Sequence, residues 1–187
     1  MLKKFYPYEY VKSVFDIDYK KLYDLGYRGV IFDIDNTLVH HGKDSTPEVD
    51  ELFREIHSIG LKTLLLSNNS AERIERFLKN IDSLYIPEAD KPKTDNYYKA
   101  VSMLGLEKKE VVFVGDQIFT DIYGANRCGI VNILVEFLRY ENDTKIGKKR
   151  TLEKWILGLY KFNRTYQHRI GDICKEKGKS EYVKEKR

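Results

Sequence analysis

Short runs of apolar residues alternate with amphipathic segments between Gly29 and Val135. The apolar runs cover residues 29–32, 61–66, 84–86, 111–114 and 131–135. Continuous apolar runs of this length are typical of parallel strands that are buried on both faces of a sheet. We therefore predict an α/β domain with a parallel sheet of about five strands, covered by helices on both faces.

The segments between these runs carry signals for single helices. Thr46 is a suitable N-cap, Pro47 follows at the first helical position, and apolar residues then recur at helical spacing until Gly60. Ser70 can cap a second helix, and a third extends from about Asp95 to Leu104. Strands that alternate with single helices indicate a parallel sheet in a three-layer sandwich.

The chain divides into three parts by pattern and charge. We expect residues 1–27 to pack on the core, residues 28–144 to form the α/β domain, and residues 145–187 to form a basic helix and a flexible tail. Within residues 148–163, apolar residues recur at helical spacing among lysines and arginines, namely Leu152, Trp155, Ile156 and Leu159. Such a helix can lie in a membrane interface, or it can pack on the body or on a second subunit. Residues 171–187 are expected to be flexible.

Composition excludes several classes of protein. Of the 187 residues, 42% are hydrophobic and 33% are charged, which supports a packed core. No apolar run approaches the roughly 20 residues of a membrane-spanning helix, and no leader pattern opens the sequence. The only cysteines are Cys128 and Cys174, too few for a disulfide framework or a thiolate zinc site. We expect a cytoplasmic protein.

The charges are unevenly distributed. Residues 1–137 carry 18 Lys and Arg against 22 Asp and Glu, whereas residues 138–187 carry 15 against 7. A basic tail on an acidic body indicates contact with an anionic partner, either nucleic acid or a membrane surface, although a solvated terminal helix has the same composition. No RNA-binding motif with stacking aromatic residues is present, so a nucleic-acid partner lacks support from a motif.

The sharpest chemical signal follows the first apolar run. Asp33 and Asp35 lie two positions apart, so an extended chain places both on the same side beyond the carboxyl end of the sheet. Ligands of open α/β sheets bind at that end. Two neighbouring carboxylates repel each other unless a cation lies between them, and Mg²⁺ prefers such hard oxygen ligands. The alternative is a pair of aspartates that forms a turn.

A second acidic signal follows the fourth run, where Asp116 ends the strand and Asp121 lies five residues further on. In a sheet with the strand order 5-4-1-2-3, the fourth strand lies beside the first, which brings Asp116 next to Asp33. Asp121 taken alone is also a suitable helix N-cap. Together, these residues predict a cation site formed by three or four aspartates.

Polar residues at two further strand ends complete a predicted phosphate site. Ser67 and Asn68 follow the second run, so a hydroxyl and backbone N–H groups lie near a helix N-terminus, where anions bind well. Lys91 follows the third run and can supply a cation to that anion. Each of these residues has an ordinary structural explanation by itself, and the order of all four signals at strand ends is what indicates a phosphate site.

This order of residues resembles the haloacid dehalogenase-like (HAD) phosphohydrolase superfamily. Its four motifs resemble residues 33–37, Ser67, Lys91 and residues 115–121 of this sequence. Residues 1–14 extend the resemblance to the YqeG-like subfamily IIIA, which is related to phosphatidylglycerophosphate phosphatases, and it covers about residues 1–160. The fold it implies is a HAD-like Rossmannoid three-layer sandwich. One departure is Asp90, an acid that could weaken the attraction of the neighbouring Lys91 for phosphate.

The resemblance implies a role for each motif residue. Asp33 would be the nucleophile that forms an aspartyl-phosphate, and Asp35 would act as general acid and then as general base. Mg²⁺ would be held by Asp33, the backbone carbonyl of Asp35, and Asp116, with support from Asp121. The phosphoryl group would be bound by Ser67, Asn68 and Lys91. The second aspartate of the first motif points to phosphatase or phosphomutase chemistry.

The intervals between the motifs favour a phosphatase without a cap domain. Only 34 positions separate Asp33 from Ser67, and 24 separate Ser67 from Lys91. An uncapped site admits large substrates such as a protein, a polymer end or a lipid headgroup. We therefore predict a Mg²⁺-dependent phosphomonoester hydrolase with phosphatidylglycerophosphate as the leading substrate, acting in the cytoplasm or peripherally at the inner membrane face. The alternatives are a phosphoprotein or other macromolecular phosphatase and a non-enzymatic RNA- or ribosome-associated module. The oligomeric state is left open.

Overall fold

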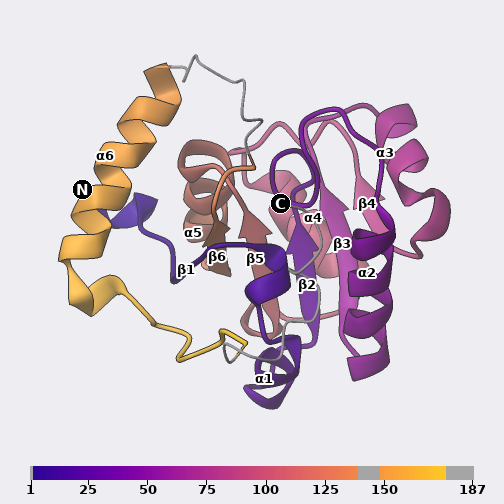
Figure 1. The fold of residues 1–187 in the computed structure, drawn as a ribbon, viewed down its shortest axis with the longest axis horizontal. Helices are drawn as coiled ribbons and strands as arrows, with labels where there is room; N and C mark the ends of the chain where they lie inside the picture. Colours follow the sequence, from indigo (N-terminus) through magenta and orange to yellow (C-terminus); the bar gives the residue numbers. More distant parts are fainter. Residues whose placement is uncertain (1, 139–147, 176–187) are drawn as a thin grey trace, which may run out of the picture.

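The sheet contains one more strand than the sequence predicts. The structure, a computed structural model, describes residues 2–138 and 148–175. Its six parallel strands lie in the order β1-β6-β5-β2-β3-β4 (Figure 1). They are β1 (Glu9–Val11), β2 (Gly29–Phe32), β3 (Lys62–Leu66), β4 (Leu84–Ile86), β5 (Val111–Gly115) and β6 (Val131–Val135). The five predicted strands, β2 to β6, have the predicted order, which confirms the fold class.

The additional strand β1 comes from the N-terminal segment and pairs with β6 at the edge of the sheet. It has only three residues, and its first, Glu9, is a buried carboxylate, so no apolar run marks it. The Glu9 carboxylate accepts a hydrogen bond from the Tyr10 N–H at 2.9 Å and lies 3.0 Å from Nδ1 of His168. These contacts offset the cost of burying a charge. The boundaries of the three parts of the chain, after residues 27 and 144, stay predictions, and residue 144 lies outside the described residues.

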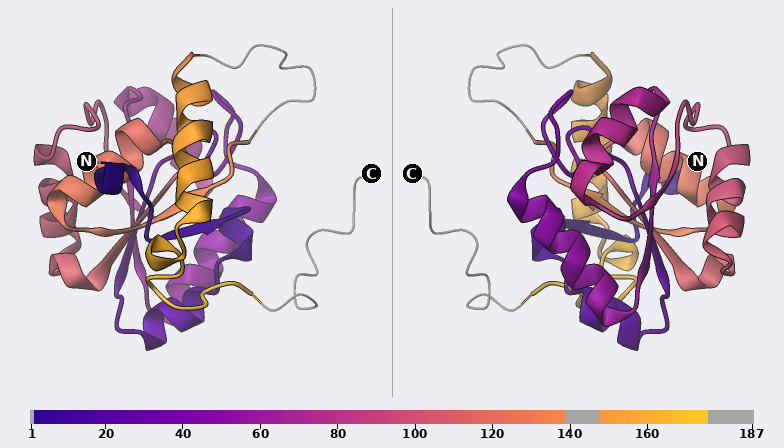
Figure 2. Two further views of the ribbon diagram at one scale, coloured as in Figure 1. Left: turned by 90° about the vertical axis from the view of Figure 1, so that its left-hand side faces the viewer. Right: turned by 90° about the vertical axis from the view of Figure 1, so that its right-hand side faces the viewer.

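Helices cover both faces of the sheet, so the chain has three layers (Figure 2). Buried side chains of α1 (Tyr19–Asp24), α2 (Pro47–Ile59) and α3 (Ala71–Phe77) pack on one face. Those of α4 (Asp95–Leu104) and α5 (Tyr123–Cys128) pack on the other. The predicted capping signals act as expected in α2, where the Thr46 hydroxyl accepts from the Val49 N–H and Gly60 ends the helix in the left-handed conformation.

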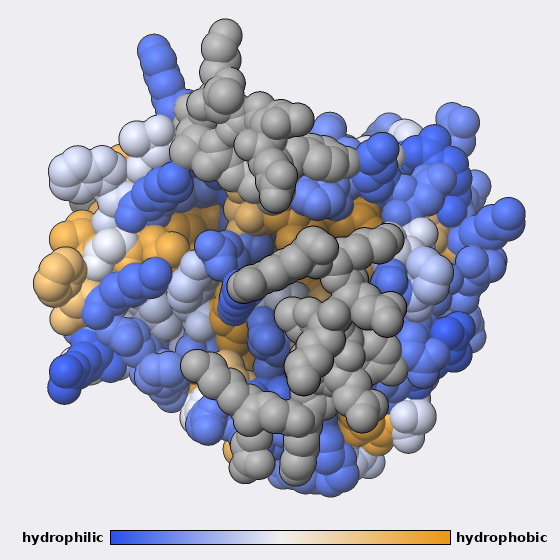
Figure 3. Space-filling view, viewed as in Figure 1, coloured by the Kyte–Doolittle hydropathy of each residue, from blue (hydrophilic) through white to orange (hydrophobic). Residues whose placement is uncertain are grey.

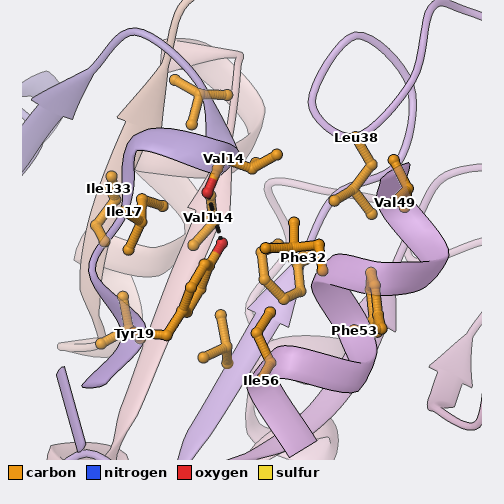
Figure 4. Close-up of a cluster of buried hydrophobic side chains, with 14 of the residues drawn as sticks. Val14, Ile17, Tyr19, Phe32, Leu38, Val49, Phe53, Ile56, Val114 and Ile133 are labelled. Atoms are coloured by element: carbon orange, nitrogen blue, oxygen red, sulfur yellow. Dashed lines mark hydrogen bonds between the residues drawn. The ribbon is translucent and has the colours of Figure 1, made fainter. Parts of the chain in front are cut away.

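Aliphatic residues fill the core on the α2 face together with the aromatic rings of Tyr19, Phe32 and Phe53 (Figure 4). The rings of Phe32 in β2 and Phe53 in α2 lie 5.5 Å apart, and the Tyr19 ring lies 6.3 Å from Phe32. The buried Tyr19 hydroxyl donates a hydrogen bond to the carbonyl of Val14 at 3.0 Å. This hydrogen bond lies within the N-terminal segment and pairs a hydroxyl whose burial would otherwise cost free energy, while the packing of the Tyr19 ring on Phe32 attaches the segment to the sheet.

No cap domain is inserted into the intervals between the predicted motifs. Every residue from Asp33 to Lys91 belongs to the described part of the chain. Beyond turns and loops, these residues form α2, β3, α3, one short 3₁₀ turn and β4. The carboxyl edge of the sheet is therefore not covered by an inserted domain from either interval.

The C-terminal helix α6 (Lys148–Phe162) stands at the β1–β6 side of the sheet (Figures 1 and 2). Its buried residues Ile156 and Tyr160 form a small apolar cluster with Leu134 of β6, Ile122 and Tyr6. The four apolar residues that recur at helical spacing are thus not all on one surface. Ile156 is buried, whereas Leu152, Trp155 and Leu159 are 54%, 73% and 48% exposed. None of the helices in the described residues combines the length and apolarity needed to cross a membrane.

The start of the predicted flexible tail is instead packed on the body. Ile173 is fully buried, and its carbonyl accepts a hydrogen bond from the Asp18 N–H at 2.7 Å. Cys174 forms an antiparallel bridge with Ile17. Residues 173–175 are thus packed on the N-terminal segment, which offers both an apolar contact and a backbone partner, and the flexibility of the tail stays a prediction. Residues 176–187 lie outside the described residues.

Removing the Phe53 ring should destabilise the domain strongly. Phe53 is 1% exposed, and a buried Phe→Ala change leaves a cavity that costs about 3–5 kcal/mol. We expect Phe53→Ala to lower the free energy of unfolding by that amount in urea denaturation. The matched control is Phe162→Ala in α6, where the ring is 91% exposed and the change should stay within about 0.5 kcal/mol. Equal effects of the two substitutions would contradict the packing described here.

Candidate active site

Polar side chains converge where strands β2, β3 and β5 end. Strands β2 and β5 are neighbours, with Phe32 opposite Val114, and the Asp33 N–H donates to the Val114 carbonyl at 2.9 Å. The residues that follow the two strands therefore lie side by side at the carboxyl edge, as the predicted strand order requires. Asp33 and Asp116 meet there, although they are far apart in the sequence.

Three carboxylates form a buried cluster at this edge. Asp33, Asp116 and Asp121 each place one oxygen within 4.8 Å of the others. Their exposed fractions are only 6%, 4% and 0%. The Thr37 hydroxyl lies between two of them, 3.4 Å from Oδ2 of Asp33 and 3.3 Å from Oδ1 of Asp116. Buried like charges at such distances destabilise the fold unless cations compensate them.

Lys91 supplies one of the compensating charges. Its Nζ lies 2.6 Å from Oδ1 of Asp33 and 2.8 Å from Oδ1 of Asp121. Burial opposes the charged ammonium, but the two carboxylates outweigh it and raise the pKa of Lys91. Asn68 contributes indirectly, because its side-chain oxygen accepts from the Lys91 backbone N–H at 2.9 Å. The suspected interference from Asp90 has no structural counterpart, since its exposed carboxylate pairs with Lys93.

The turn after β5 brings Asp121 into the cluster because Gly115 has no side chain. A Cβ at Gly115 would lie 2.6 Å from Cγ of Asp121. The Asp121 carboxylate also accepts from the Gln117 N–H at 3.0 Å. The Tyr97 hydroxyl of α4 donates to the Thr120 carbonyl at 2.9 Å, which holds the backbone of the same turn against the α4 layer. Asp121 is thus part of the carboxylate cluster rather than a simple helix cap.

The Asp35 side chain occupies a separate polar environment. Its carboxylate accepts hydrogen bonds from the Gly42 N–H at 3.0 Å and from Nδ2 of Asn69 at 2.9 Å. Nη2 of Arg73 lies 3.3 Å from Oδ1 of Asp35. Asn69 also donates to Oγ of Ser67 at 3.0 Å, which links the ends of β2 and β3. Asp35 is therefore held beside the carboxylate cluster, and its side chain is not one of the three grouped carboxylates.

Burial raises the pKa of two acids of the cluster, Asp33 and Asp116. It raises the pKa of Asp33 to about 6, although the ammonium of Lys91 acts in the opposite direction. Burial likewise raises the pKa of Asp116 to about 8, opposed by the guanidinium of Arg150. Both carboxylates therefore gain from an additional cation, and three converging carboxylate oxygens are the hard ligands that divalent metals such as Mg²⁺ bind. The cluster is compatible with a divalent metal.

Several contacts of the site were not anticipated from the sequence. Thr37 and Asn69 adjoin predicted residues, so their place in the motifs was a usable signal. Arg73 lies in the first turn of α3, three residues after its N-cap, and nothing in the pattern links it to Asp35. Arg150 reaches Asp116 from α6, 34 residues further along the chain, and no local signal marks this contact.

Comparisons with known proteins show which family the chain belongs to. The family model of haloacid dehalogenase-like hydrolases matches residues 43–129. The probable phosphatase YqeG of Bacillus subtilis is 36% identical over 163 residues, which cover 86% of this chain and 95% of that protein. The chloroplastic/mitochondrial phosphatidylglycerophosphate phosphatase 1 of Arabidopsis thaliana is 26% identical over 162 residues, which cover 81% of this chain but 47% of that protein.

Among solved structures, NagD of Escherichia coli K-12 has the same fold, with a TM-score of 0.51. It is 15% identical, and the match covers 66% of this chain and 94% of that chain. Fold and sequence together define a haloacid dehalogenase-like hydrolase. The chain belongs to the YqeG-like phosphatases of this superfamily, as the motifs predicted, and it is a HAD-type phosphatase.

The effect of Mg²⁺ on stability should depend on pH. The pKa values of Asp33 and Asp116 in the folded protein, about 6 and about 8, lie above the usual value of 3.8. The folded state therefore binds protons more tightly than the unfolded state, and the contribution of these groups to stability falls as pH rises from about 4 to about 8. Metal binding requires the deprotonated acids, so the increase in Tm caused by Mg²⁺ should be larger at pH 8 than at pH 5.5.

Differential scanning calorimetry with and without MgCl₂ at both pH values measures this difference. Asp116→Asn should lose most of the Mg²⁺-induced increase in Tm at either pH, because one ligand is missing. An increase in the wild-type Tm of the same size at pH 5.5 and pH 8 would contradict the prediction.

Proposed function

We propose that the protein hydrolyses phosphomonoesters with Mg²⁺ through an aspartyl-phosphate on Asp33. The observation that carries this proposal is the different environment of the two aspartates at the end of β2. Asp33 lies in the buried cluster beside Lys91, where a phosphoryl group would meet positive charge. Asp35 lies outside the cluster, where it can exchange protons. One carboxylate can thus act as nucleophile and the other as acid and base.

In the proposed reaction, an oxygen of Asp33 attacks phosphorus, and the bond from phosphorus to the leaving oxygen breaks as Asp35 transfers a proton to that oxygen. A water molecule then loses a proton to Asp35 and attacks the phosphorus, which releases phosphate and restores the Asp33 carboxylate. Asn69, Arg73 and the Gly42 N–H orient Asp35 for both transfers. Positioning of this kind supplies much of the rate enhancement in phosphoryl transfer.

Ser67 and Lys91 are the proposed ligands of the transferring phosphoryl group, and Asn68 fixes the backbone of Lys91. The metal would be held by Asp33, Asp116, Asp121 and the backbone carbonyl of Asp35. When bound, Mg²⁺ supplies charge neutralisation for the phosphoryl oxygens. Lys91 adds a positive charge on the same side, since it already pairs with Asp33 and Asp121.

Replacing the proposed nucleophile should abolish hydrolysis without unfolding the protein. Asp33→Asn removes one acid from the buried cluster at nearly the same volume, so the fold should be retained while phosphate release from an aryl phosphate falls by at least about a thousandfold. Asp24→Asn, at an exposed position in α1, is the matched control and should leave the rate unchanged. Phosphate release that survives Asp33→Asn, or that persists after chelation of the metal, would exclude the proposed mechanism.

For the substrate, we propose a lipid phosphate such as phosphatidylglycerophosphate at an anionic membrane surface. The relative from Arabidopsis thaliana carries that substrate in its name, and the uncapped intervals leave room for a headgroup that is attached to a bilayer. The third support comes from α6, whose outward face is apolar. This surface, the α6 apolar stripe, consists of Leu152, Trp155, Leu159 and Phe162.

The composition of α6 suits a peripheral contact with a membrane. Apolar side chains gather over the α6 side of the molecule, bordered by hydrophilic ones (Figure 3). The exposed residues Lys148, Lys149 and Lys154 lie on the same helix, and each lysine near an anionic leaflet contributes about 1 kcal/mol. A helix with Trp, Leu and Phe on one side and lysines around them can lie in the interface of a bilayer. We propose that the protein acts peripherally at such a surface.

Polar substitutions in the α6 apolar stripe should affect lipid and soluble substrates differently. A variant with Gln at all four positions should lose most of its activity on phosphatidylglycerophosphate in anionic vesicles but keep its activity on an aryl phosphate, because the substituted side chains are exposed. The matched control carries Leu25→Gln and Met103→Gln, two exposed apolar residues outside α6. Phosphate release is measured for both substrates, and for sugar phosphates, nucleotides and phosphopeptides in parallel.

Equal losses on vesicles and on the aryl phosphate would mean that the stripe supports the fold and not a membrane contact. A preference for a soluble metabolite or for a phosphopeptide over the lipid would exclude the proposed substrate.

A further inference from the structure

Helix α6 reaches the carboxylate cluster with one side chain, Arg150 in its first turn. Nη1 of Arg150 donates to the Asp116 carbonyl at 2.9 Å, and Nη2 forms an ion pair with Oδ2 of Asp116. The guanidinium thus holds both the backbone and the carboxylate of a proposed metal ligand. A paired contact of this kind fixes orientation as well as charge.

Arg150 is itself held by two further groups, the Glu153 carboxylate and the Phe137 ring. Oε2 of Glu153 accepts from its Nη1 at 3.0 Å, and the Phe137 ring lies 4.3 Å below the guanidinium carbon. The other oxygen of Glu153 accepts from the Phe119 N–H at 3.2 Å, which joins α6 to the turn that carries Asp121. Glu153 is 7% exposed and the Arg150 side chain 21%, so this network is largely shielded from water and differs from an exposed ion pair.

The two oxygens of Asp116 face different partners. Oδ1 meets the Thr37 hydroxyl, which also contacts Asp33, so this oxygen lies on the side of the carboxylate cluster. Oδ2 is bound by Arg150 on the side of α6. A cation in the cluster can therefore use one oxygen while the guanidinium keeps the other, and the carboxylate stays oriented toward the cluster.

We propose that Arg150 is a positioning residue for Asp116, so that metal binding and the docking of α6 on the domain support each other. The inference rests on the proposed role of Asp116 as a metal ligand. Partners that hydrogen-bond a metal ligand without contacting the metal orient it, and their loss usually weakens metal affinity 10- to 100-fold. Because binding free energies are reciprocal, a metal that gains from docked α6 must in turn stabilise the docking.

The first test is isothermal titration calorimetry of Mg²⁺ in the absence of substrate. Arg150→Ala should weaken Mg²⁺ binding at least about tenfold, and Arg150→Lys should restore part of the affinity, because it keeps the charge but loses the forked geometry. Arg164→Ala, an exposed arginine just beyond α6, is the matched control and should bind Mg²⁺ as the wild type does. Unchanged or tighter binding by Arg150→Ala would overturn the proposal.

The second test measures hydrogen exchange of the α6 amides by mass spectrometry. Mg²⁺ should slow exchange in residues 148–162 of the wild type, and this protection should be lost in Arg150→Ala. A purely structural role of Arg150 would instead speed up exchange to the same extent with and without the metal. Exchange in α6 that is unaffected by Mg²⁺ in the wild type would contradict the coupling.

These readouts separate the inference from the proposed function. A wild type that binds Mg²⁺ but hydrolyses no phosphomonoester, with weakened binding in Arg150→Ala, would exclude only the function. A wild type that hydrolyses phosphomonoesters, with equal Mg²⁺ affinity in Arg150→Ala, would exclude only the positioning role. A wild type that binds no Mg²⁺ would overturn both the metal site and the role of Arg150.

Discussion

The burial of three carboxylates at the carboxyl edge of the sheet is the constraint on which the contacts around the site depend. Asp33, Asp116 and Asp121 are nearly inaccessible to water, so their charges must be compensated by the protein or by a bound cation. Lys91 compensates from one side and Arg150 from the other. These two cations do not fully offset the effect of burial, because the pKa values of Asp33 and Asp116 are still raised. This arrangement is compatible with a divalent metal, which would add the positive charge that the buried carboxylates lack.

The fold brings the site residues together because neighbouring strands end side by side and the turns after them pack closely. Parallel strands β2 and β5 end side by side, which brings together acids from distant parts of the sequence. The missing side chain of Gly115 then lets Asp121 approach, and Tyr97 holds the backbone of that turn from the α4 layer. Asp35 is oriented by separate contacts to Asn69 and to α3, so the two aspartates of one short segment experience different environments. The division of labour proposed for them follows from these different contacts.

Local pattern predicted the five strands and the capping of α2, and the alternation of strands and helices predicted the strand order. Of the predicted site residues, the structure brings Asp33, Lys91, Asp116 and Asp121 together. The prediction missed β1, because a three-residue edge strand that begins with a buried glutamate has no apolar run. It also missed Arg73 and Arg150, since a long cationic side chain looks like solvated surface until the fold shows a carboxylate within reach. The apolar residues of α6 lie on different surfaces for a similar reason: helical spacing identifies an apolar face, but only the docking partner decides that Ile156 is buried and Trp155 is not.

The two sides of helix α6 therefore make different contacts, although they belong to one rigid element. Its inner side contacts the carboxylate cluster through Arg150 and the sheet through Ile156, whereas its outer side presents the α6 apolar stripe. A helix cannot change its position on one side without moving the other, because its residues are fixed relative to each other by backbone hydrogen bonds. Any surface that binds the stripe in the docked position would consequently favour the contact between Arg150 and Asp116, and through it the proposed metal site. Through this connection, the proposed membrane contact and the proposed metal site would support each other without a second domain that closes over the site.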